Sequence, residues 1–248
     1  MTDRLTFLTW NLAMLARSAE APPAWGQEHT EFAVRQQVLD VEPDLVLFQE
    51  LPRIVPYIDT HDMIKANPES HQGNLATLVS HDLLARCGQP DVRVVPSCAV
   101  LITLSLKDRK SSADADERIT IANVHLAPGP GPEAAAERLA QLADVVEASP
   151  TPHLVVIGDT NTRVAELDAL AVGGLSAPRP PKATWNSKRN RFNTTGPEFT
   201  AYFTRVFVTD QLRVTKQKVV DSPTEADGHR FHLSDHFALT GSVTGVTS

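Results

Sequence analysis

Short apolar runs of strand length recur from one end of the chain to the other. Several of them alternate apolar and polar residues with a period of two, which is typical of strands in a sheet with one buried face. The predicted strands cover residues 4–10, 44–49, 75–80, 99–106, 118–126, 153–158, 202–209, 212–220 and 237–243. Segments 29–41 and 132–148 have helical spacing, and Pro132 suits the first turn of the second helix. We therefore predict an α/β protein with many strands and fewer helices.

The connection between two of these strands indicates a mixed sheet. Residues 99–106 and 118–126 are joined by the charged segment "KDRKSSADADE", which is typical of an antiparallel hairpin with a solvated tip. The chain contains no internal repeat and no linker long enough to separate two domains. We expect a single domain over residues 1–248.

Composition and charge exclude several classes of protein. The chain carries 23 Lys and Arg against 30 Asp and Glu, and the resulting net charge of −7 argues against sequence-blind coating of nucleic acid. No apolar run reaches the roughly 18 residues that a membrane span needs. The N-terminus lacks the pattern of a signal peptide, and two cysteines offer no disulfide framework. We expect a soluble, cytoplasmic protein that does not bind a membrane.

Polar side chains interrupt or end several of the predicted strands. Each one taken singly is an ordinary turn residue or a structural histidine. Strand ends of one packed sheet share an edge, however, and crevices at such edges are where α/β proteins bind ligands. Their joint occurrence therefore predicts one site that combines carboxylates, carboxamides and imidazoles. The residues are Asn11, Glu50, His125, Asp159, Asn161, Asp235 and His236.

The motifs around these residues carry a resemblance to a known family. "TWNL", "FQEL", "NVHL", "GDTN" and "SDH" occur in the order and approximate spacing of the endonuclease/exonuclease/phosphatase superfamily, which has the deoxyribonuclease I-like fold. "HLAPGPGPEAAAERLAQL", "GDTNTR" and "ATWNSKRNRF" before "FTRVFV" are similar to the second type of tyrosyl-DNA phosphodiesterase. The resemblance implies a four-layer α/β/β/α sandwich with two mixed, mostly antiparallel sheets.

The resemblance also implies a reaction and its cofactor. It is the Mg²⁺-dependent hydrolysis of phosphodiester bonds at nucleic-acid 5′ ends, with Mn²⁺ as an alternative ion. DNA is a better candidate than RNA, a 5′-phosphotyrosyl-DNA adduct is one candidate substrate, and a smaller phosphodiester is another. Other nucleases and small-molecule phosphatases of the superfamily stay open as alternatives. We expect the protein to be a monomer.

The chemistry of phosphodiester hydrolysis assigns roles to the residues of this set. Mg²⁺ prefers hard oxygen ligands and uses one or two carboxylates, so Glu50 is the expected direct ligand, with Asn11 beside it and Asp235 acting through water. Asp159 is expected to position or deprotonate the attacking water, supported by Asn161. The two imidazoles are expected to donate hydrogen bonds to the non-bridging oxygens. They belong to His125 and His236.

One position departs from the family pattern. The family pairs its last catalytic histidine with the aspartate of a motif resembling F-D-R-I-F, whereas this chain has "FTRVF", with Thr204 at the aspartate position. A hydroxyl orients an imidazole but supplies no charge, so either His236 is less basic than its family counterpart or another acid, such as Asp210 or Asp227, replaces the aspartate. A phosphate-binding or nucleic-acid-binding module without turnover is therefore an alternative.

A basic segment supplies candidates for substrate binding. Residues 178–197 contain five cations and no acid, which fits either a solvated loop or a groove for a polyanion. Trp185 favours the groove because an indole stacks on an unpaired base, although Asn186 stands where the family has an acid. The candidate residues are Trp185, Lys188, Arg189 and Arg191, and the other two cations are Arg179 and Lys182.

A different metal site is also conceivable in the C-terminal part. "GHRFHLSDH" contains three imidazoles, His229, His232 and His236, at spacings of three and four residues. Zinc favours such nitrogen-rich sets. The three side chains would have to share one face across a loop-to-strand junction.

Overall fold

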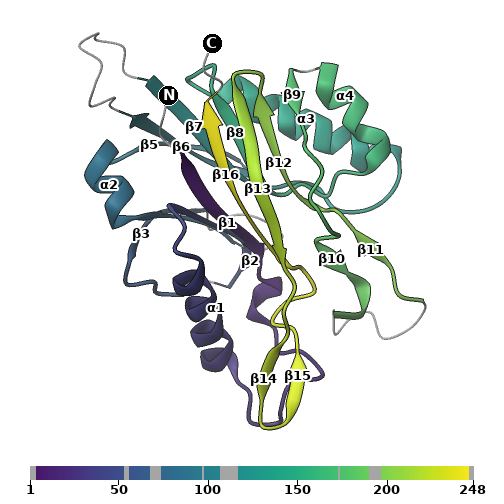
Figure 1. The fold of residues 1–248 in the computed structure, drawn as a ribbon. Coiled ribbons are helices and arrows are strands. Elements are labelled where there is room, and N and C mark those ends of the chain that lie inside the picture. Colours follow the sequence, from purple (N-terminus) through teal and green to yellow (C-terminus); the bar gives the residue numbers. More distant parts are fainter. Residues whose placement is uncertain are drawn as a thin grey trace.

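The structure is a computed structural model, and it describes residues 4–52, 56–67, 74–96, 98–106, 117–172, 174–189 and 197–245. Two six-stranded sheets pack against each other, and helices lie on the outside (Figure 1). The mixed α/β class expected from the sequence is therefore confirmed. In the described part of the chain, no helix has the length and apolar character that crossing a membrane requires.

The first sheet has the strand order β13-β16-β1-β2-β4-β3. Its strands are β1 (Leu5–Asn11), β2 (Leu45–Leu51), β3 (His61–Asn67), β4 (Asn74–Ser80), β13 (Leu212–Val220) and β16 (Ala238–Gly245). Strands β1 and β2 run parallel, and the other neighbours are antiparallel.

The second sheet has the order β5-β6-β7-β8-β12-β9. Its strands are β5 (Asp91–Val95), β6 (Ala99–Leu106), β7 (Glu117–His125), β8 (Leu154–Asp159), β9 (Leu175–Ser176) and β12 (Thr204–Thr209). Strands β6 and β7 form the expected antiparallel pair, while β7 and β8 are parallel. Most of the segment that joins β6 to β7 lies outside the described residues.

Apolar side chains from both sheets form the central core. It includes Leu47 of the first sheet and Ile121 and Val206 of the second. Helix α1 (Gln27–Val41) covers the outer face of the first sheet, and α3 (Pro132–Ala148) covers the outer face of the second. These layers give the predicted α/β/β/α sandwich, with the two sheets packed between outer helical layers.

Shorter elements complete the fold. They are α2 (His81–Cys87), α4 (Leu167–Val172), the paired strands β10 (Trp185–Asn186) and β11 (Thr200–Ala201), the hairpin strands β14 (Thr224–Ala226) and β15 (His229–Phe231), and 3-10 turns at Ala13–Leu15, Val164–Glu166 and Ser187–Arg189. The nine strands and two helices predicted from the sequence are all found, whereas these shorter elements and the edge strands β3, β5 and β9 were missed. Short and exposed strands such as β5 carry no long apolar pattern to detect.

Candidate active site

Four of the predicted polar residues meet where strand ends of the two sheets face each other. Asn11 ends β1 and Glu50 is the penultimate residue of β2, in the first sheet. His125 ends β7 and Asp159 ends β8, in the second sheet. Both pairs of strands are parallel, so their carboxyl ends lie at the same edge of each sheet. The sandwich therefore brings together residues up to 148 positions apart.

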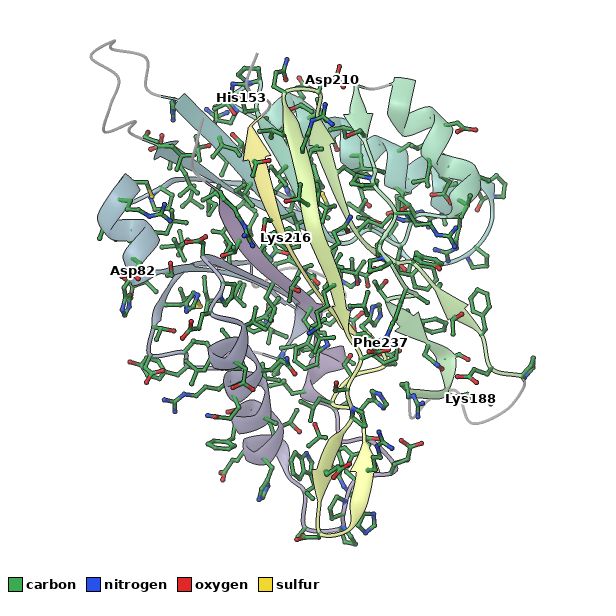
Figure 2. All side chains as sticks on the ribbon, in the orientation of Figure 1. Asp82, His153, Lys188, Asp210, Lys216 and Phe237 are labelled. Carbon is green, nitrogen blue, oxygen red and sulfur yellow. The ribbon has the colours of Figure 1, made fainter. Side chains whose placement is uncertain are left out.

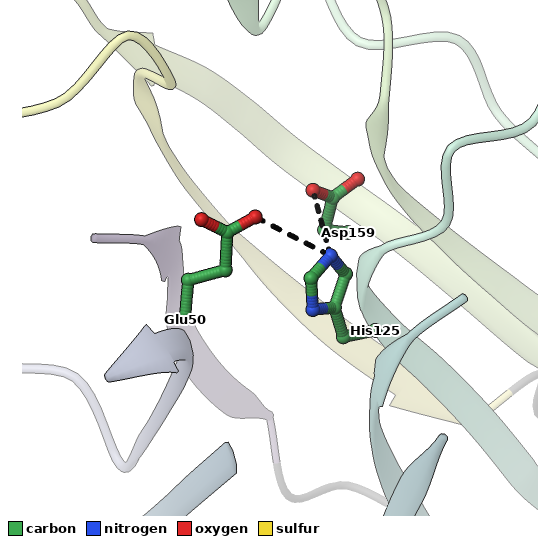
Figure 3. A group of neighbouring side chains, drawn as sticks. All are labelled: Glu50, His125 and Asp159. Carbon is green, nitrogen blue, oxygen red and sulfur yellow. Dashed lines mark ion pairs between the residues drawn. The ribbon is translucent and has the colours of Figure 1, made fainter. Parts of the chain in front are cut away.

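Figure 3 shows three of these side chains pointing toward one another from opposite sheets. His125 Nε2 lies 3.5 Å from Glu50 Oε1 and 3.6 Å from Asp159 Oδ2. Asn11 Nδ2 donates hydrogen bonds of 2.9 Å to Glu50 Oε1 and 2.8 Å to Asp159 Oδ2. One carboxamide and one imidazole thus connect the two carboxylates across the gap between the sheets.

Two further predicted residues surround this group. His236 Nε2 lies 3.7 Å from Asp159 Oδ2. Asn161 has a left-handed backbone with φ 50°, its amide nitrogen donates to Asp159 Oδ1 at 3.2 Å, and its Nδ2 donates to the Leu126 carbonyl at 3.1 Å. Both oxygens of the Asp159 carboxylate are therefore held by donors, and this carboxylate is oriented before any ligand binds.

Asp235 is placed differently from the other predicted residues. Its Oδ2 accepts a 2.8 Å hydrogen bond from the indole nitrogen of Trp185, and its Oδ1 lies 3.5 Å from the Ser234 hydroxyl. Asp235 lines the same cavity as Glu50 but stands outside the group of carboxylates and imidazole described above. In this arrangement it orients Trp185 on the cavity wall.

The group formed by Glu50, His125 and Asp159 has the donor set of a divalent-metal site. One donor atom from each of the three lies within 4.8 Å of the others. Burial raises the pKa of Glu50, and the nearby His125 and the Asn11 amide offset this only in part. The carboxylates of Glu50 and Asp159 lie close together with little positive charge nearby, and this arrangement attracts a cation. Carboxylate oxygens suit Mg²⁺ or Mn²⁺, so the residues fit such an ion.

A cavity of about 680 Å³ opens above these residues. Glu50, His125 and Asp159 are in its lining, together with the aromatic side chains Trp185, Phe199 and Phe203. The Trp185 ring lies 5.3 Å from Phe203 and 5.8 Å from Phe199, centroid to centroid. Three arginines, Arg17, Arg163 and Arg189, also line it. The cavity therefore combines two carboxylates, those of Glu50 and Asp159, with a wall suited to a planar, anionic ligand.

Two of these arginines were not predicted from the sequence as residues of the site. Arg17 donates through Nη2 to the carbonyls of Ala21 and Pro22, at 2.8 Å and 2.9 Å. Arg163 packs over the Phe203 ring at 4.3 Å and donates to the Asn161 carbonyl. The position of Arg163 two residues after Asn161 in "GDTNTR" was an available signal, whereas no sequence pattern marks Arg17.

The basic segment reaches the cavity through fewer residues than expected. Arg189 lines it, but Arg179 packs over the Tyr202 ring at 4.3 Å and Lys182 pairs with Asp221 at 3.0 Å. Lys188 is not in the cavity lining, and Figure 2 shows it beside β10. Arg191 lies outside the described residues. Of the four predicted substrate-binding residues, the structure thus places Trp185 and Arg189 at the cavity.

The departure at Thr204 leaves the Nδ1 atom of His236 without an acidic partner. Thr204 Oγ1 and His236 Nδ1 are both buried and lack a hydrogen-bond partner among the described residues. Thr184 lies between the two segments, since its hydroxyl accepts from the Thr204 amide at 3.0 Å and its carbonyl accepts from the amide of Phe237. Thr184 therefore connects the start of β12, which carries Thr204, to the segment that carries His236.

Neither of the two acids considered as replacements takes the place of the missing aspartate. Asp210 follows the opposite end of β12 from Thr204, about 20 Å along a six-residue strand. Figure 2 shows Asp210 at the far end of the sheets from Phe237, the neighbour of His236. Asp227 occupies the turn between β14 and β15. Neither acid hydrogen-bonds to His236 Nδ1, which lacks a partner among the described residues.

The three imidazoles proposed for zinc are directed to separate partners. His229 Nδ1 lies 3.2 Å from the Glu20 carbonyl, and His232 Nε2 lies 3.2 Å from the Asp221 carbonyl. Only His236 faces the carboxylate group. Within the described ranges, the potential metal ligands that cluster are Glu50, His125 and Asp159. The zinc interpretation is not supported by this geometry.

A buried arginine supports the loop that forms one side of the cavity. Arg138 of α3 is fully buried, and its Nη1 donates to the carbonyls of Ala127 and Gly129 at 2.9 Å and 3.0 Å. Its Nε and Nη2 bind the two oxygens of Glu166 at 2.9 Å and 2.6 Å. Gly129 lines the cavity, so this bidentate ion pair fixes the cavity wall to the helix.

We expect the substitution Arg138→Met to lower the free energy of unfolding by about 3–5 kcal/mol, because it leaves Glu166 and two loop carbonyls without their donor. Urea unfolding followed by circular dichroism measures the change. The matched control is Arg35→Met, which breaks a solvent-exposed pair with Asp59 and should cost less than about 1 kcal/mol. Equal losses in the two variants would contradict the supporting role of Arg138.

Solved structures with a similar fold were found in several organisms. TDP2 from D. rerio complexed with a single-strand DNA product has a TM-score of 0.67 and 15% identity, over 97% of this chain and 99% of that chain. An endonuclease/exonuclease/phosphatase family protein from Bacteroides thetaiotaomicron has a TM-score of 0.70 and 16% identity, over 99% of both chains. A mannosyl-6-phosphatase from the same organism has a TM-score of 0.64 and 14% identity, over 97% of this chain and 99% of that chain.

The sequence comparisons are consistent with these structures. No curated protein matches the chain. The model of the Endonuclease/Exonuclease/phosphatase family matches residues 8–236, a range that includes every residue of the carboxylate and imidazole group described above. The resemblance predicted from the sequence motifs is confirmed, and the chain belongs to the endonuclease/exonuclease/phosphatase family.

Proposed function

We propose that this protein is a Mg²⁺-dependent phosphodiesterase that hydrolyses phosphodiester bonds at nucleic-acid 5′ ends, with Mn²⁺ as an alternative ion. The observation that carries the proposal is the meeting of Glu50 and Asp159 from opposite sheets, bridged by Asn11 Nδ2, below a cavity of about 680 Å³. Membership of a hydrolase family supports the reaction class.

The side chains around Asp159 can perform the steps of such a hydrolysis. A phosphodiester resists water because its anionic oxygens repel the nucleophile. Asp159 is held by Asn11 and by the Asn161 amide, so it can orient a water and accept its proton. His125 and His236 both direct Nε2 toward this carboxylate and can donate to the non-bridging oxygens. A divalent ion held at Glu50 would supply positive charge to the same oxygens.

The cavity wall supports a nucleic-acid end as the substrate. Three arginines match a phosphate backbone, and the Trp185 indole can stack on a base or on a tyrosine ring. We therefore propose DNA in preference to RNA, with a 5′-phosphotyrosyl adduct as the leading candidate. The fold shared with TDP2, whose structure holds single-strand DNA product, is in keeping with this choice.

Two alternatives rest on specific observations. A phosphatase acting on a small molecule is favoured by the similar fold of the mannosyl-6-phosphatase. A binding module without turnover is favoured by Thr204, because His236 Nδ1 lacks an acidic partner.

One substrate panel separates these functions. The purified protein is incubated with a 5′-phosphotyrosyl DNA oligonucleotide, the matched RNA oligonucleotide and mannose 6-phosphate, each with Mg²⁺, Mn²⁺ or EDTA. We expect a free DNA 5′ phosphate with either ion and none with EDTA. Release of phosphate from the sugar alone would support the phosphatase. Binding of the oligonucleotide without cleavage, together with cleavage by Thr204→Asp, would support the binding module.

A further inference from the structure

Two buried side-chain amides lie next to the group formed by Glu50, His125 and Asp159, and neither lines the cavity. Gln49 belongs to β2 in the first sheet and Asn123 to β7 in the second, and both are fully buried. Gln49 Nε2 donates to Asn123 Oδ1 at 2.8 Å, so the pair joins the two sheets inside the buried core. Gln49 precedes Glu50, and Asn123 lies two residues before His125.

The backbone of β2 is irregular where Gln49 lies. Leu45 and Leu47 face the core between the sheets, while Val46 and Phe48 face α1. Strict alternation would return Leu51 to the side of Leu45, yet Leu51 packs on the side of α1. The register of β2 with β4 also shifts between Phe48 and Leu51. One extra residue is therefore inserted here, as in a β-bulge.

Glu50 is the residue that this bulge redirects. Its φ of 49° lies in the left-handed region, which an ordinary side chain adopts only at a cost of about 1 kcal/mol or more. The left-handed turn takes its side chain out of the alternating pattern and into the cavity lining. The position of the Glu50 carboxylate therefore depends on whatever holds the bulge.

The two amides hydrogen-bond to the strands around the bulge. Asn123 Nδ2 donates to the Phe48 carbonyl at 3.2 Å and to the Ala76 carbonyl at 2.9 Å, and these belong to the two strands whose register shifts. Gln49 Nε2 also lies 3.1 Å from Thr9 Oγ1 and 3.0 Å from the Leu47 carbonyl. Because carbonyls only accept, these contacts determine which atom of each amide is nitrogen.

This hydrogen-bond network lowers the stability of the fold at one atom. Gln49 Oε1 is buried and lacks a hydrogen-bond partner among the described residues. A buried unsatisfied polar atom costs about 1–3 kcal/mol, and apolar side chains of similar shape would avoid it. Strain and unsatisfied groups that persist are concentrated at functional sites.

We infer that Gln49 and Asn123 are positioning residues that set the bulge at Glu50 and, through it, the separation of the Glu50 carboxylate from Asp159. This inference rests on the proposed function, because it concerns the affinity of the Glu50, His125 and Asp159 group for a divalent ion. Outer partners that orient metal ligands change affinity by about 10–100-fold when they are removed. The pair would act through Glu50 and would not touch the substrate.

The test is the double variant Gln49→Leu/Asn123→Val, which removes both amides and leaves the core apolar. Mn²⁺ binding is measured by isothermal titration calorimetry, and folding by circular dichroism and thermal unfolding. We expect the dissociation constant for Mn²⁺ to rise about tenfold or more in a folded protein. The single variant Gln49→Leu, which keeps the Asn123 bonds to the two carbonyls, should weaken binding less, and it replaces the double variant if that variant does not fold.

The matched control is Thr103→Val/Thr120→Val. These two hydroxyls are buried and lie 3.2 Å apart on β6 and β7, but no hydrogen bond connects them to β2. The control should leave Mn²⁺ binding unchanged. Wild-type affinity for Mn²⁺ in the folded double variant, or in folded Gln49→Leu where it replaces the double variant, would overturn the inference. If the wild-type protein bound neither Mn²⁺ nor Mg²⁺, the proposed function would fail instead.

Discussion

The substitution Asp159→Asn is expected to lower kcat for cleavage of a 5′-phosphotyrosyl DNA oligonucleotide by about 10²–10⁴-fold, which is the range for loss of a positioned general base. Asp159 is almost fully buried, and its carboxylate accepts from both Asn11 Nδ2 and the Asn161 amide. An amide keeps the shape of this side chain but accepts a proton far less readily. Single-turnover assays at saturating Mg²⁺ measure the chemical step, and circular dichroism confirms the fold.

The matched control for Asp159 is Asp210→Asn. Asp210 is exposed and follows the opposite end of β12, so its substitution should leave kcat within about twofold of wild type, in line with the small effects of surface changes. If Asp159→Asn kept more than a tenth of the wild-type kcat, Asp159 would not be the general base.

The substitution Glu50→Gln is expected to raise the dissociation constant for Mn²⁺ by more than about 100-fold, the upper end of the range for residues that act only through a ligand. Glu50 supplies one of two carboxylates in the group, and its removal halves the local negative charge. Glutamine keeps an oxygen for Asn11 Nδ2, so the hydrogen bond to Glu50 Oε1 can persist without the charge. Calorimetric titration with Mn²⁺ measures affinity independently of turnover.

Activity measured against Mg²⁺ concentration gives a second readout for Glu50. Because the variant binds the ion more weakly, higher Mg²⁺ should restore part of the rate in Glu50→Gln and none in Asp159→Asn. The control Glu147→Gln, at an exposed position of α3, should match wild type in both assays. Unchanged Mn²⁺ affinity in Glu50→Gln would remove Glu50 from the metal site.

Local patterns explain why much of the site was predictable. The strands that carry Asn11, Glu50, His125 and Asp159 are buried and apolar, so their periodicity stands out in the sequence. Polar residues at the ends of such strands are conspicuous for the same reason. The prediction that they converge is confirmed for these four residues and for Asn161 and His236. Their catalytic roles, the single domain, the monomeric state and the cytoplasmic location stay predictions.

Contacts between distant side chains explain what was missed. The 2.8 Å hydrogen bond from the Trp185 indole to Asp235 was not predicted, and the expected action of Asp235 on the metal through water stays a prediction. Arg17 and Arg163 reach the cavity through loops whose paths depend on carbonyls they bind. Hydrogen bonds of this kind leave no periodic trace in the sequence.

The sequence by itself determined nine of the strands and the two longest helices, the chemical types available for the site, and the family, because periodicity and short motifs are properties of neighbouring residues. Only the tertiary structure decided where each carboxylate points. The bulge at Glu50 and the amide pair beneath it depend on two sheets packed face to face, since Gln49 and Asn123 are 74 positions apart and meet only in that core. The distance between Glu50 and Asp159 therefore depends on how the two sheets pack, and no single segment of the sequence encodes it.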